Sequence, residues 1–431
     1  MLTTKYVRDH LDEIRASMKK RKSTYPLEEL LKLDEDWRGL KTKLQELQTR
    51  RNKESLEISQ LKKEKKDITE KVAGLAKVKD EIVRIEGELP NYEMRIDGLL
   101  WNMPNTLHDT VPYGESSEQN VTLRKWGDVP KKSAKGHEEI LLSLGLIDIE
   151  RAAKVSGARF YYLKGDMVLL EQSLIRFALD LLTKKGYTTI SPPYMIKKKY
   201  YKGVTALGDF EDALYRIGDP KEVEAKKEYE KVDEDLFLIS TSEHPMAAMH
   251  AEETFAGNQL PLRYAGVSMC FRREAGAHGK DTKGMFRVHQ FYKVEQFIFS
   301  RQDDSWSYFD ELIGNAEEVF QKLKLPYRVV EICTGDIGTV AARKNDIEAW
   351  MPSQQDYREV VSCSNCTDWQ GIRLDIKYDD KGERKYVHTL NSTAVATTRA
   401  LVAIVENYAN DDGTITVPDV LVPYMGKKVI G

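Results

Sequence analysis

Two arginine-bearing segments border a glycine-rich loop in the second half of the chain. The first ends in Phe271-Arg272-Arg273-Glu274, and the second begins with Phe286-Arg287-Val288-His289-Gln290-Phe291. Alternating apolar and polar residues on both sides predict two strands joined as a long hairpin. Such a hairpin can hold Arg272 on a half-buried surface, where its planar guanidinium binds a phosphate or a carboxylate through two hydrogen bonds. The alternative is a structural ion pair between Arg272 and Glu274 or Glu295.

Two further sets of side chains add an aromatic platform and carboxylates. Alternation along the returning strand places Phe291 and Glu295 on the same face. Thr241, Ser242 and Glu243 follow the apolar run 236–240, so a hydroxyl and a carboxylate lie at a strand end. Glu243 is suited to hold an ammonium group. Capping of the helical stretch that follows is the alternative role for this segment.

The last clusters suit phosphate and metal chemistry. Glu359 and Ser362 offer a carboxylate and a hydroxyl to a Mg²⁺ that substrate phosphates also hold. Asn391-Ser392-Thr393 precedes small residues, which predicts a helix N-terminus open to a ligand, with Arg399 inside the helix as a cation. Each cluster alone is more often structural. Together they match amino acid activation by ATP, in which a carboxylate attacks the α-phosphate in line and catalysis consists of positioning and charge neutralisation.

Composition narrows the class of protein. The chain has 431 residues, with 66 Lys+Arg against 69 Asp+Glu, so no global positive charge indicates a nucleic acid partner. Four cysteines are too scattered for a disulfide framework. The pair Cys363 and Cys366 has no second pair at zinc spacing, so we predict structural packing for it. The absence of an apolar leader or a run of membrane-spanning length favours a soluble, cytoplasmic protein with no membrane partner.

The elements that must position these clusters form a mixed scaffold. Residues 101–129, with three prolines nearby, are expected to be a linker. Beyond it, helical patterns cover 167–184, 306–323 and 394–408, and β-rich runs cover 187–190, 236–239, 291–299, 328–332, 346–350 and 371–378. No regular helix separates the strands, which predicts an α+β domain with a mostly antiparallel sheet.

The N-terminal third carries two heptad seams. The first runs through Leu30, Leu33, Trp37, Leu40, Leu44 and Leu47, and the second through Leu75, Val78, Ile82, Ile85 and Leu89, where Pro90 interrupts it. The polar break between the seams favours an antiparallel helical hairpin over a single long helix in a dimeric coiled coil. This arm would serve either in oligomerisation or in binding a phosphate backbone through Arg50, Arg51, Lys53, Lys62, Lys63, Lys65 and Lys66.

In these motifs the chain resembles the seryl-tRNA synthetases of class II. The resemblance covers nearly the whole length and rests on Gly186 to Pro193, Thr241-Ser242-Glu243, the hairpin from Phe271 to Glu295, Arg358 to Asn365, and Thr389 to Arg399. The amino-acid sequence from Cys363 to Asp368 is similar to that of the archaeal and eukaryotic branch of the family. One departure is that Ala394, Ala396 and Thr397 stand where the class usually has glycines. Alanine there still suits this family. The zinc-dependent variant of the family has a different architecture whose ligands this sequence does not supply, so the resemblance implies no zinc.

The resemblance implies a fold and a domain division. Residues 1–110 would be a tRNA-binding domain with a long helical hairpin, and residues 111–431 the class II catalytic domain. Its largely antiparallel sheet would have seven strands flanked by helices. The segment from Gly186 to Pro193 resembles the first signature of the class, and dimerisation would occur through it, around Pro192.

The resemblance also implies site residues, with Arg272, Glu359 and Arg399 as the catalytic ones. ATP would be bound by Arg272, Arg273, Glu274, Val288, Phe291, Glu359, Val360, Val361, Ser362 and Arg399. Glu359 and Ser362 would hold Mg²⁺. L-Serine would be bound by Thr241, Ser242, Glu243, Arg272, Glu295, Asn391 and Thr393. The tRNA would be contacted by Arg50, Arg51, Lys53, Lys62 and Lys63 on the arm and by Lys280 and Lys283 in the hairpin loop.

The implied activity is a cytoplasmic, homodimeric serine–tRNA ligase. ATP and serine would give seryl-adenylate and pyrophosphate, and the 3′ end of tRNA(Ser) would then take the seryl group. Whether tRNA(Sec) is also charged stays open. A ligase that loads a carrier protein and an inactive interaction protein are the alternatives. The arm counts against the former, and the retention of Arg272, Glu359 and Arg399 against the latter.

Overall fold

The chain divides into two compact units, Met1–Pro104 and Asn105–Gly431, which are described separately. The structure, a computed structural model, describes residues 3–130, 135–206, 213–218, 235–274 and 284–431. Lys280 and Lys283, expected to contact tRNA, lie outside the described residues.

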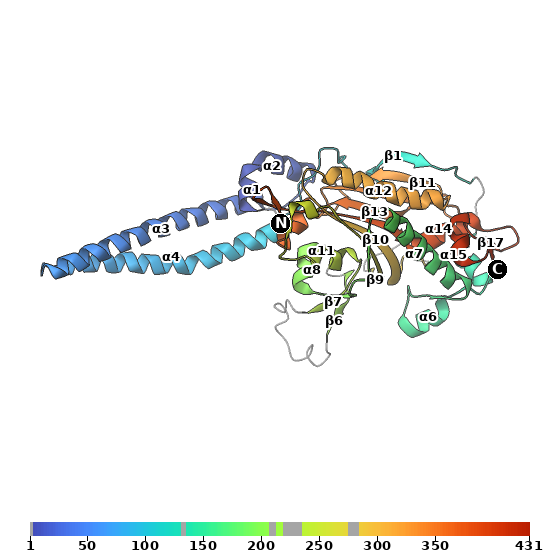
Figure 1. Cartoon of the computed structure of the whole chain (residues 1–431), viewed down its shortest axis with the longest axis horizontal. Coiled ribbons are helices and arrows are strands. Elements are labelled where there is room, and N and C mark those ends of the chain that lie inside the picture. Colours follow the sequence, from blue (N-terminus) through green and yellow to red (C-terminus); the bar gives the residue numbers. More distant parts are fainter. Residues whose placement is uncertain (1–2, 131–134, 207–212, 219–234, 275–283) are drawn as a thin grey trace. The chain divides into compact units, whose positions relative to one another are not determined.

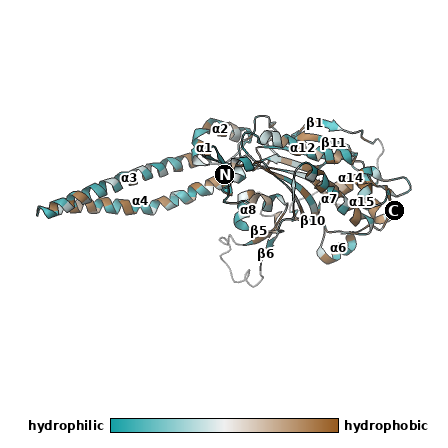
Figure 2. Cartoon of the chain, in the orientation of Figure 1, coloured by the Kyte–Doolittle hydropathy of each residue, from teal (hydrophilic) through white to brown (hydrophobic). Residues whose placement is uncertain are grey.

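Unit 1 is helical. It contains α1 (Thr4–Asp9), α2 (Leu11–Lys20), α3 (Leu27–Lys63) and α4 (Thr69–Trp101). The two long helices lie side by side (Figure 1), and Lys43–Glu81 and Lys71–Glu57 ion pairs link them at 2.6 and 2.7 Å. The pairing of early α3 residues with late α4 residues confirms the antiparallel hairpin. Apolar and polar residues alternate along both helices (Figure 2).

The expected interruption at Pro90 is wrong, because α4 continues through it. A proline inside a helix removes one hydrogen bond and costs about 3 kcal/mol. Ile85, Leu89 and Ile96 are buried on either side of this position. Their packing holds the helix together across the proline.

Unit 2 is built on a sheet whose described strands number eight, in the order β1-β11-β12-β13-β16-β10-β9-β4. Among the described strands of this sheet, only β4 and β9 pair in parallel, so the mostly antiparallel prediction is confirmed. The strands are β1 (Val121–Trp126), β4 (Thr188–Ile190), β9 (Leu262–Phe271), β10 (Gln290–Ser300), β11 (Tyr327–Glu331), β12 (Arg343–Met351), β13 (Asp356–Asn365) and β16 (His388–Ala396).

Three helices cover much of the sheet's apolar surface: α7 (Asp166–Lys184), α12 (Ser305–Lys322) and α14 (Thr397–Tyr408). Their side chains share one core cluster with β10, which includes Leu174, Phe309, Leu401 and Val294. The described chain also contains shorter elements. They are α5 (His137–Ser143), α6 (Ile149–Ser156), α8 (Lys198–Val204), α11 (Glu243–Ala248), α13 (Trp369–Arg373), α15 (Val422–Met425), β2 (Ile147–Asp148), β3 (Tyr162–Leu163), β5 (Met195–Lys197), β6 (Arg216–Ile217), β7 (Leu236–Leu238), β8 (Thr254–Ala256), β14 (Lys377–Asp380), β15 (Glu383–Tyr386), β17 (Ile415–Thr416) and β18 (Val429–Ile430).

Three expectations about unit 2 need correction. The linker at 101–129 contains β1, which makes the sheet one strand wider than the resemblance implies. Residues 371–378 are not one strand, because α13 occupies their first part. The helix expected from residue 394 begins at Thr397, after β16. None of the described helices combines the length and the apolar composition needed to cross a membrane.

Candidate active site

A cavity of about 420 Å³ opens in unit 2 beside β9, β10, β13 and β16. Its lining unites residues that are far apart in the sequence, and twelve of them were predicted. The predicted lining residues are Thr241, Glu243, Arg272, Glu274, Phe291, Glu295, Glu359, Val360, Ser362, Asn391, Thr393 and Arg399.

Four of the residues predicted to bind ATP or serine are not among the lining residues. Val288 and Val361 are buried in the main core cluster. Ser242 is buried, and its hydroxyl donates to the Gly266 carbonyl at 3.2 Å. Arg273 follows the pocket arginine and donates its backbone N–H to the Ala213 carbonyl at 2.9 Å. The contacts predicted between a nucleotide and Arg273, Val288 and Val361 stay predictions.

Arg272 stands immediately after β9, where the hairpin sets its position. Its backbone N–H donates to the His289 carbonyl at 2.9 Å, and its Nε donates to the Ser240 carbonyl at 3.3 Å. The guanidinium carbon lies 5.2 Å from the centre of the Phe291 ring. The carboxylates considered as its structural partners pair with other cations, Glu274 with Arg287 and Glu295 with Lys293. Arg272 is therefore directed into the cavity beside an aromatic platform.

Glu243 begins α11 and is oriented by two amide groups. Its Oε1 accepts from Gln370 Nε2 at 3.0 Å and from Asn391 Nδ2 at 3.1 Å. Its backbone N–H donates to Thr241 Oγ1 at 3.2 Å. Burial, together with the negative charge of Glu295, raises the pKa of Glu243 to about 7. A carboxylate poised in this way is suited to an ammonium ligand, which would favour its charged form.

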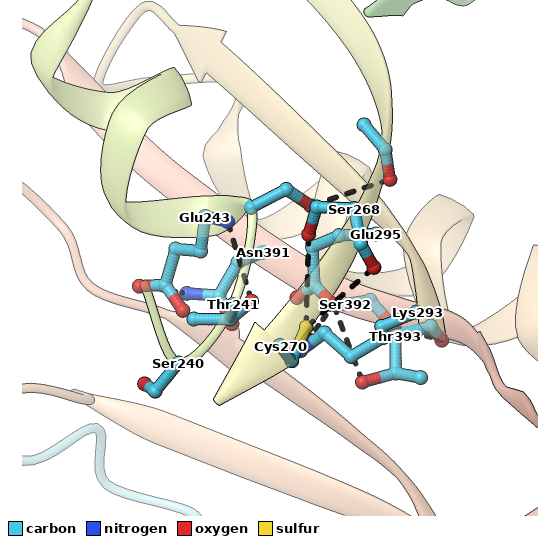
Figure 3. Close-up of polar contacts among 12 residues, drawn as sticks. Ser240, Thr241, Glu243, Ser268, Cys270, Lys293, Glu295, Asn391, Ser392 and Thr393 are labelled. Carbon is cyan, nitrogen blue, oxygen red and sulfur yellow. Dashed lines mark hydrogen bonds and ion pairs between the residues drawn. The ribbon is translucent and has the colours of Figure 1, made fainter. Parts of the chain in front are cut away.

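A second buried carboxylate, Glu295, lies deeper in the cavity. Its Oε2 accepts from Lys293 Nζ at 2.5 Å and from Thr393 Oγ1 at 3.3 Å. Figure 3 shows these side chains with Asn391 and Thr241 around one space. Lys293 was missed, although the alternation that paired Phe291 with Glu295 also places Lys293 on their face. Gln370 was also missed, and no sequence signal singled it out.

The predicted helix start at Ala394, directly after Asn391-Ser392-Thr393, is wrong. These residues belong to β16, where Asn391 pairs with Phe297 and Thr393 with Glu295. The ladder to β10 outweighs the helical preference of the small residues that follow. Strand alternation then sends Asn391 and Thr393 into the cavity, and Ser392 bonds its own strand's Thr393 carbonyl at 3.2 Å.

The opposite end of the cavity is built by Glu359, Ser362 and Arg399. Arg399 Nη1 contacts Glu359 Oε1 at 3.2 Å. Burial opposes the charge of Glu359, but Arg399, Lys344 and Arg272 together lower the pKa of this carboxyl to about 2. Residues three apart on a regular strand face opposite sides. A β-bulge in the pairing of β12 with β13 removes this conflict, because Ile347 pairs with Val361 and Glu348 with Glu359.

This bulge lets Glu359 and Ser362 face the same cavity, and the donor set fits a hard divalent cation. An ionised carboxylate and a hydroxyl are oxygen ligands of the kind Mg²⁺ takes. No cluster of three or more His, Cys, Asp or Glu side chains with metal-ligand geometry occurs among the residues that the structure describes. A cation here would need further oxygen ligands from a bound phosphate.

The predicted arm residues lie in unit 1, along or at the end of α3. Arg50 pairs with Glu54 at 2.6 Å, and the side chains of Lys53, Lys62 and Lys63 are exposed. Arg51 is half-buried and donates to Asn52. These side chains are accessible to a partner, and their contact with tRNA stays a prediction.

Comparisons with known proteins identify the family. Residues 1–107 match the model of the seryl-tRNA synthetase N-terminal domain, and residues 224–408 match that of the class II tRNA synthetase core domain (G, H, P, S and T). The serine–tRNA ligase of Methanoculleus marisnigri is 49% identical, with 99% of each chain covered. That of Pyrococcus abyssi is 47% identical, with 100% of this chain and 97% of the relative covered.

Solved structures agree with this result. The seryl-tRNA synthetase of Pyrococcus horikoshii complexed with ATP matches with a TM-score of 0.93 at 45% identity, covering 100% of this chain and 99% of that one. The cytoplasmic serine–tRNA ligase of Naegleria fowleri in complex with AMP gives a TM-score of 0.86 at 39% identity, with 97% and 95% covered. The chain belongs to the seryl-tRNA synthetase family.

Proposed function

We propose that the chain is a serine–tRNA ligase, which activates L-serine with ATP and transfers the seryl group to tRNA(Ser). The observation that carries the proposal is the grouping of Glu243, Arg272, Glu295 and Arg399 in one cavity. Two carboxylates and two arginines there match the charges of an amino acid and a nucleoside triphosphate. The full-length similarity to serine–tRNA ligases supports the same conclusion.

The amino acid would lie between the two carboxylates. Its ammonium group binds Glu243 and Thr241, and its hydroxyl faces Glu295, Asn391 and Thr393. Arg272 holds the serine carboxylate beside the α-phosphate, so that both reacting anions share one cation. A carboxylate oxygen then attacks the α-phosphorus, the bond to the bridging oxygen breaks, and pyrophosphate leaves. Charge neutralisation and alignment supply the catalysis, because no covalent enzyme intermediate forms.

The nucleotide would occupy the side of the cavity nearer to Phe291 and Glu359. Phe291 stacks on adenine, Glu274 reads its polar edge, and Arg399 neutralises the γ-phosphate. Glu359 and Ser362 would hold a Mg²⁺ ion, which when bound neutralises phosphate charge. Arg399 keeps Glu359 ionised for this purpose, as its contact at 3.2 Å indicates.

The proposed macromolecular partners are tRNA and a second copy of the chain. The arm residues Arg50, Arg51, Lys53, Lys62 and Lys63 would bind the tRNA backbone, and residues 1–110 would be the tRNA-binding domain attached to a catalytic domain over 111–431. A homodimer would form around Pro192, in the cytoplasm.

The test is ATP–pyrophosphate exchange with a panel of amino acids. Serine should support exchange, and alanine should be rejected by about 10⁴-fold in kcat/KM, because a site built to bond a hydroxyl is left with unpaired buried polar groups by the analogue that lacks it. Threonine keeps the hydroxyl and tests pocket size near Thr393 instead. Comparable kcat/KM values for serine and alanine would refute the assignment of the pocket.

A further inference from the structure

Lys293 is a buried cation at the amino acid end of the cavity. The exposed fractions of the side chains are 8% for Lys293 and 1% for Glu295, and their charged atoms are 2.5 Å apart. Both residues lie on β10 and project to the same face, because alternate residues of a strand share a side. Two adjacent strands, β9 and β16, fix the backbone there by pairing Lys293 with Ser268 and with Ala396. The ion pair is therefore held rigidly.

Glu295 needs this partner. A lone carboxylate in a buried site loses its hydration and is strongly destabilised, and a close cation offsets that loss. The described hydrogen bonds of Glu295, from Lys293 and Thr393, both end on Oε2. Oε1 is then the oxygen able to accept from a ligand hydroxyl. Lys293 thus fixes both the charge and the orientation of Glu295.

The charged side chains at the amino acid end of the cavity determine which amino acid side chain fits there. The described charged residues that line this end are Glu243, Glu295, Arg272 and Lys293. In the proposed function, Glu243 matches the ammonium group of the amino acid and Arg272 matches its carboxylate. Glu295 and Lys293 cancel each other within the protein. The space for the amino acid side chain is consequently neutral, although it contains a carboxylate.

We propose that Lys293 is a specificity-determining residue, which neutralises Glu295 so that the pocket accepts a hydroxyl and rejects a cationic side chain. This inference rests on the proposed function. It predicts that removing the charge of Lys293 exposes Glu295 as a site for a second ammonium group. The matching probe is 2,3-diaminopropionate, in which an ammonium replaces the serine hydroxyl at nearly the same size.

The experiment measures kcat/KM for serine and for 2,3-diaminopropionate in ATP–pyrophosphate exchange, at a pH where both amines of the analogue are charged. In Lys293→Met the ratio of serine to analogue should fall by about tenfold or more, since close buried charge pairs couple by at least this amount. Lys293→Arg keeps the charge and should restore the wild-type preference. Lys324→Met, which breaks an exposed pair with Asp419 at 2.8 Å, is the matched control and should not change the ratio.

A second pair of variants covers the case in which Lys293→Met does not fold. Glu295→Gln leaves Lys293 unbalanced and should reject the analogue more strongly than the wild type does. The double variant Lys293→Met, Glu295→Gln removes both charges and should lose this added rejection. Equal ratios in these two variants, or an unchanged ratio in folded Lys293→Met, would overturn the role of Lys293. A wild type that does not activate serine would instead overturn the proposed function.

Discussion

Arg272 is the residue on which adenylate formation should depend most. It is expected to bridge the serine carboxylate and the α-phosphate, and its Nε bond to the Ser240 carbonyl already fixes its direction. Arg272→Ala should lower the exchange rate by on the order of 10²–10³-fold or more, because a preorganised charge contact is lost. Arg124→Ala, which removes a surface pair with Glu317, is the control for loss of any arginine. Near-normal exchange in folded Arg272→Ala would contradict the assignment.

Glu243 should give the reaction a pH dependence of known sign. Its pKa is raised to about 7, so the carboxyl loses its charge as the pH falls through this value. The kcat/KM for serine should therefore decrease below pH 7, by about tenfold per unit once the group is mostly protonated. At saturating serine the decrease should begin at lower pH, because the bound ammonium favours the ionised form.

The measurement is exchange kinetics between pH 5.5 and 8 with ATP saturating. Glu243→Gln removes the titrating group and should flatten this limb of the profile at a reduced kcat/KM. A wild-type profile that stays flat down to pH 5.5 would show that Glu243 does not need its charge to bind the amino acid.

At the scale of elements, the backbone conformation of the segment that leads into β10 requires a glycine at position 284. Gly284 has φ +65°, and a Cβ there would lie 2.2 Å from His137 Nε2. The same imidazole accepts from the Met285 N–H at 3.2 Å and contacts Glu406 through Nδ1 at 3.0 Å. Phe286, which follows Met285, lies against Arg399, with 5.1 Å between the guanidinium carbon and the ring centre.

Gly284→Ala should therefore destabilise the protein and impair adenylation together. Gly145 has a similar φ of +68°, and a Cβ added there would meet no described atom within 4 Å, so Gly145→Ala measures the backbone cost alone. We expect about 1 kcal/mol for Gly145→Ala and about 2–3 kcal/mol for Gly284→Ala in denaturant unfolding. Equal losses in the two variants would show that His137 yields to the added methyl group.

Elements with a buried face were predictable from the sequence, and others were not. β10 was found as the β-rich run 291–299 and is buried along most of its length, and the helices α7 and α12, whose apolar stripes face the core, were found as well. β1 carries no such signal, because all six of its side chains are exposed. The end of β16 and the start of α14 were confused, since small residues suit both structures and only pairing with β10 decides between them.

Site residues that lie on a single strand could be predicted from motifs and from the alternation of side chains along that strand. Glu359 and Ser362 share the cavity for a reason that the sequence does not reveal, namely the bulge opposite Ile347 and Glu348. Gln370 reaches Glu243 from α13, across 127 positions of chain. Contacts of this kind depend on tertiary packing, so no local pattern predicts them.

At the scale of the whole molecule, the arm should separate the two half-reactions. The residues proposed for activation lie in unit 2, whereas α3 and α4 lie in unit 1. Replacing residues 30–99 with a short linker should leave serine-dependent exchange intact and abolish transfer to tRNA. The remaining tRNA binding should depend less on salt, because fewer counterions are released when fewer basic residues meet the backbone.

The alternative role of the arm, in holding two subunits together, predicts a different result for the same deletion variant. Loss of the arm would then dissociate the dimer in sedimentation, and exchange would fall with it.

Lys62→Glu with Lys63→Glu provides the intact-arm comparison, since both side chains are exposed at the end of α3 and reversing their charge disturbs no core. This double variant should weaken transfer while exchange and sedimentation stay unchanged. An arm-less dimer that charges tRNA at the normal rate would exclude the arm from tRNA binding, because no other part of the proposal gives the tRNA backbone a comparable row of cations.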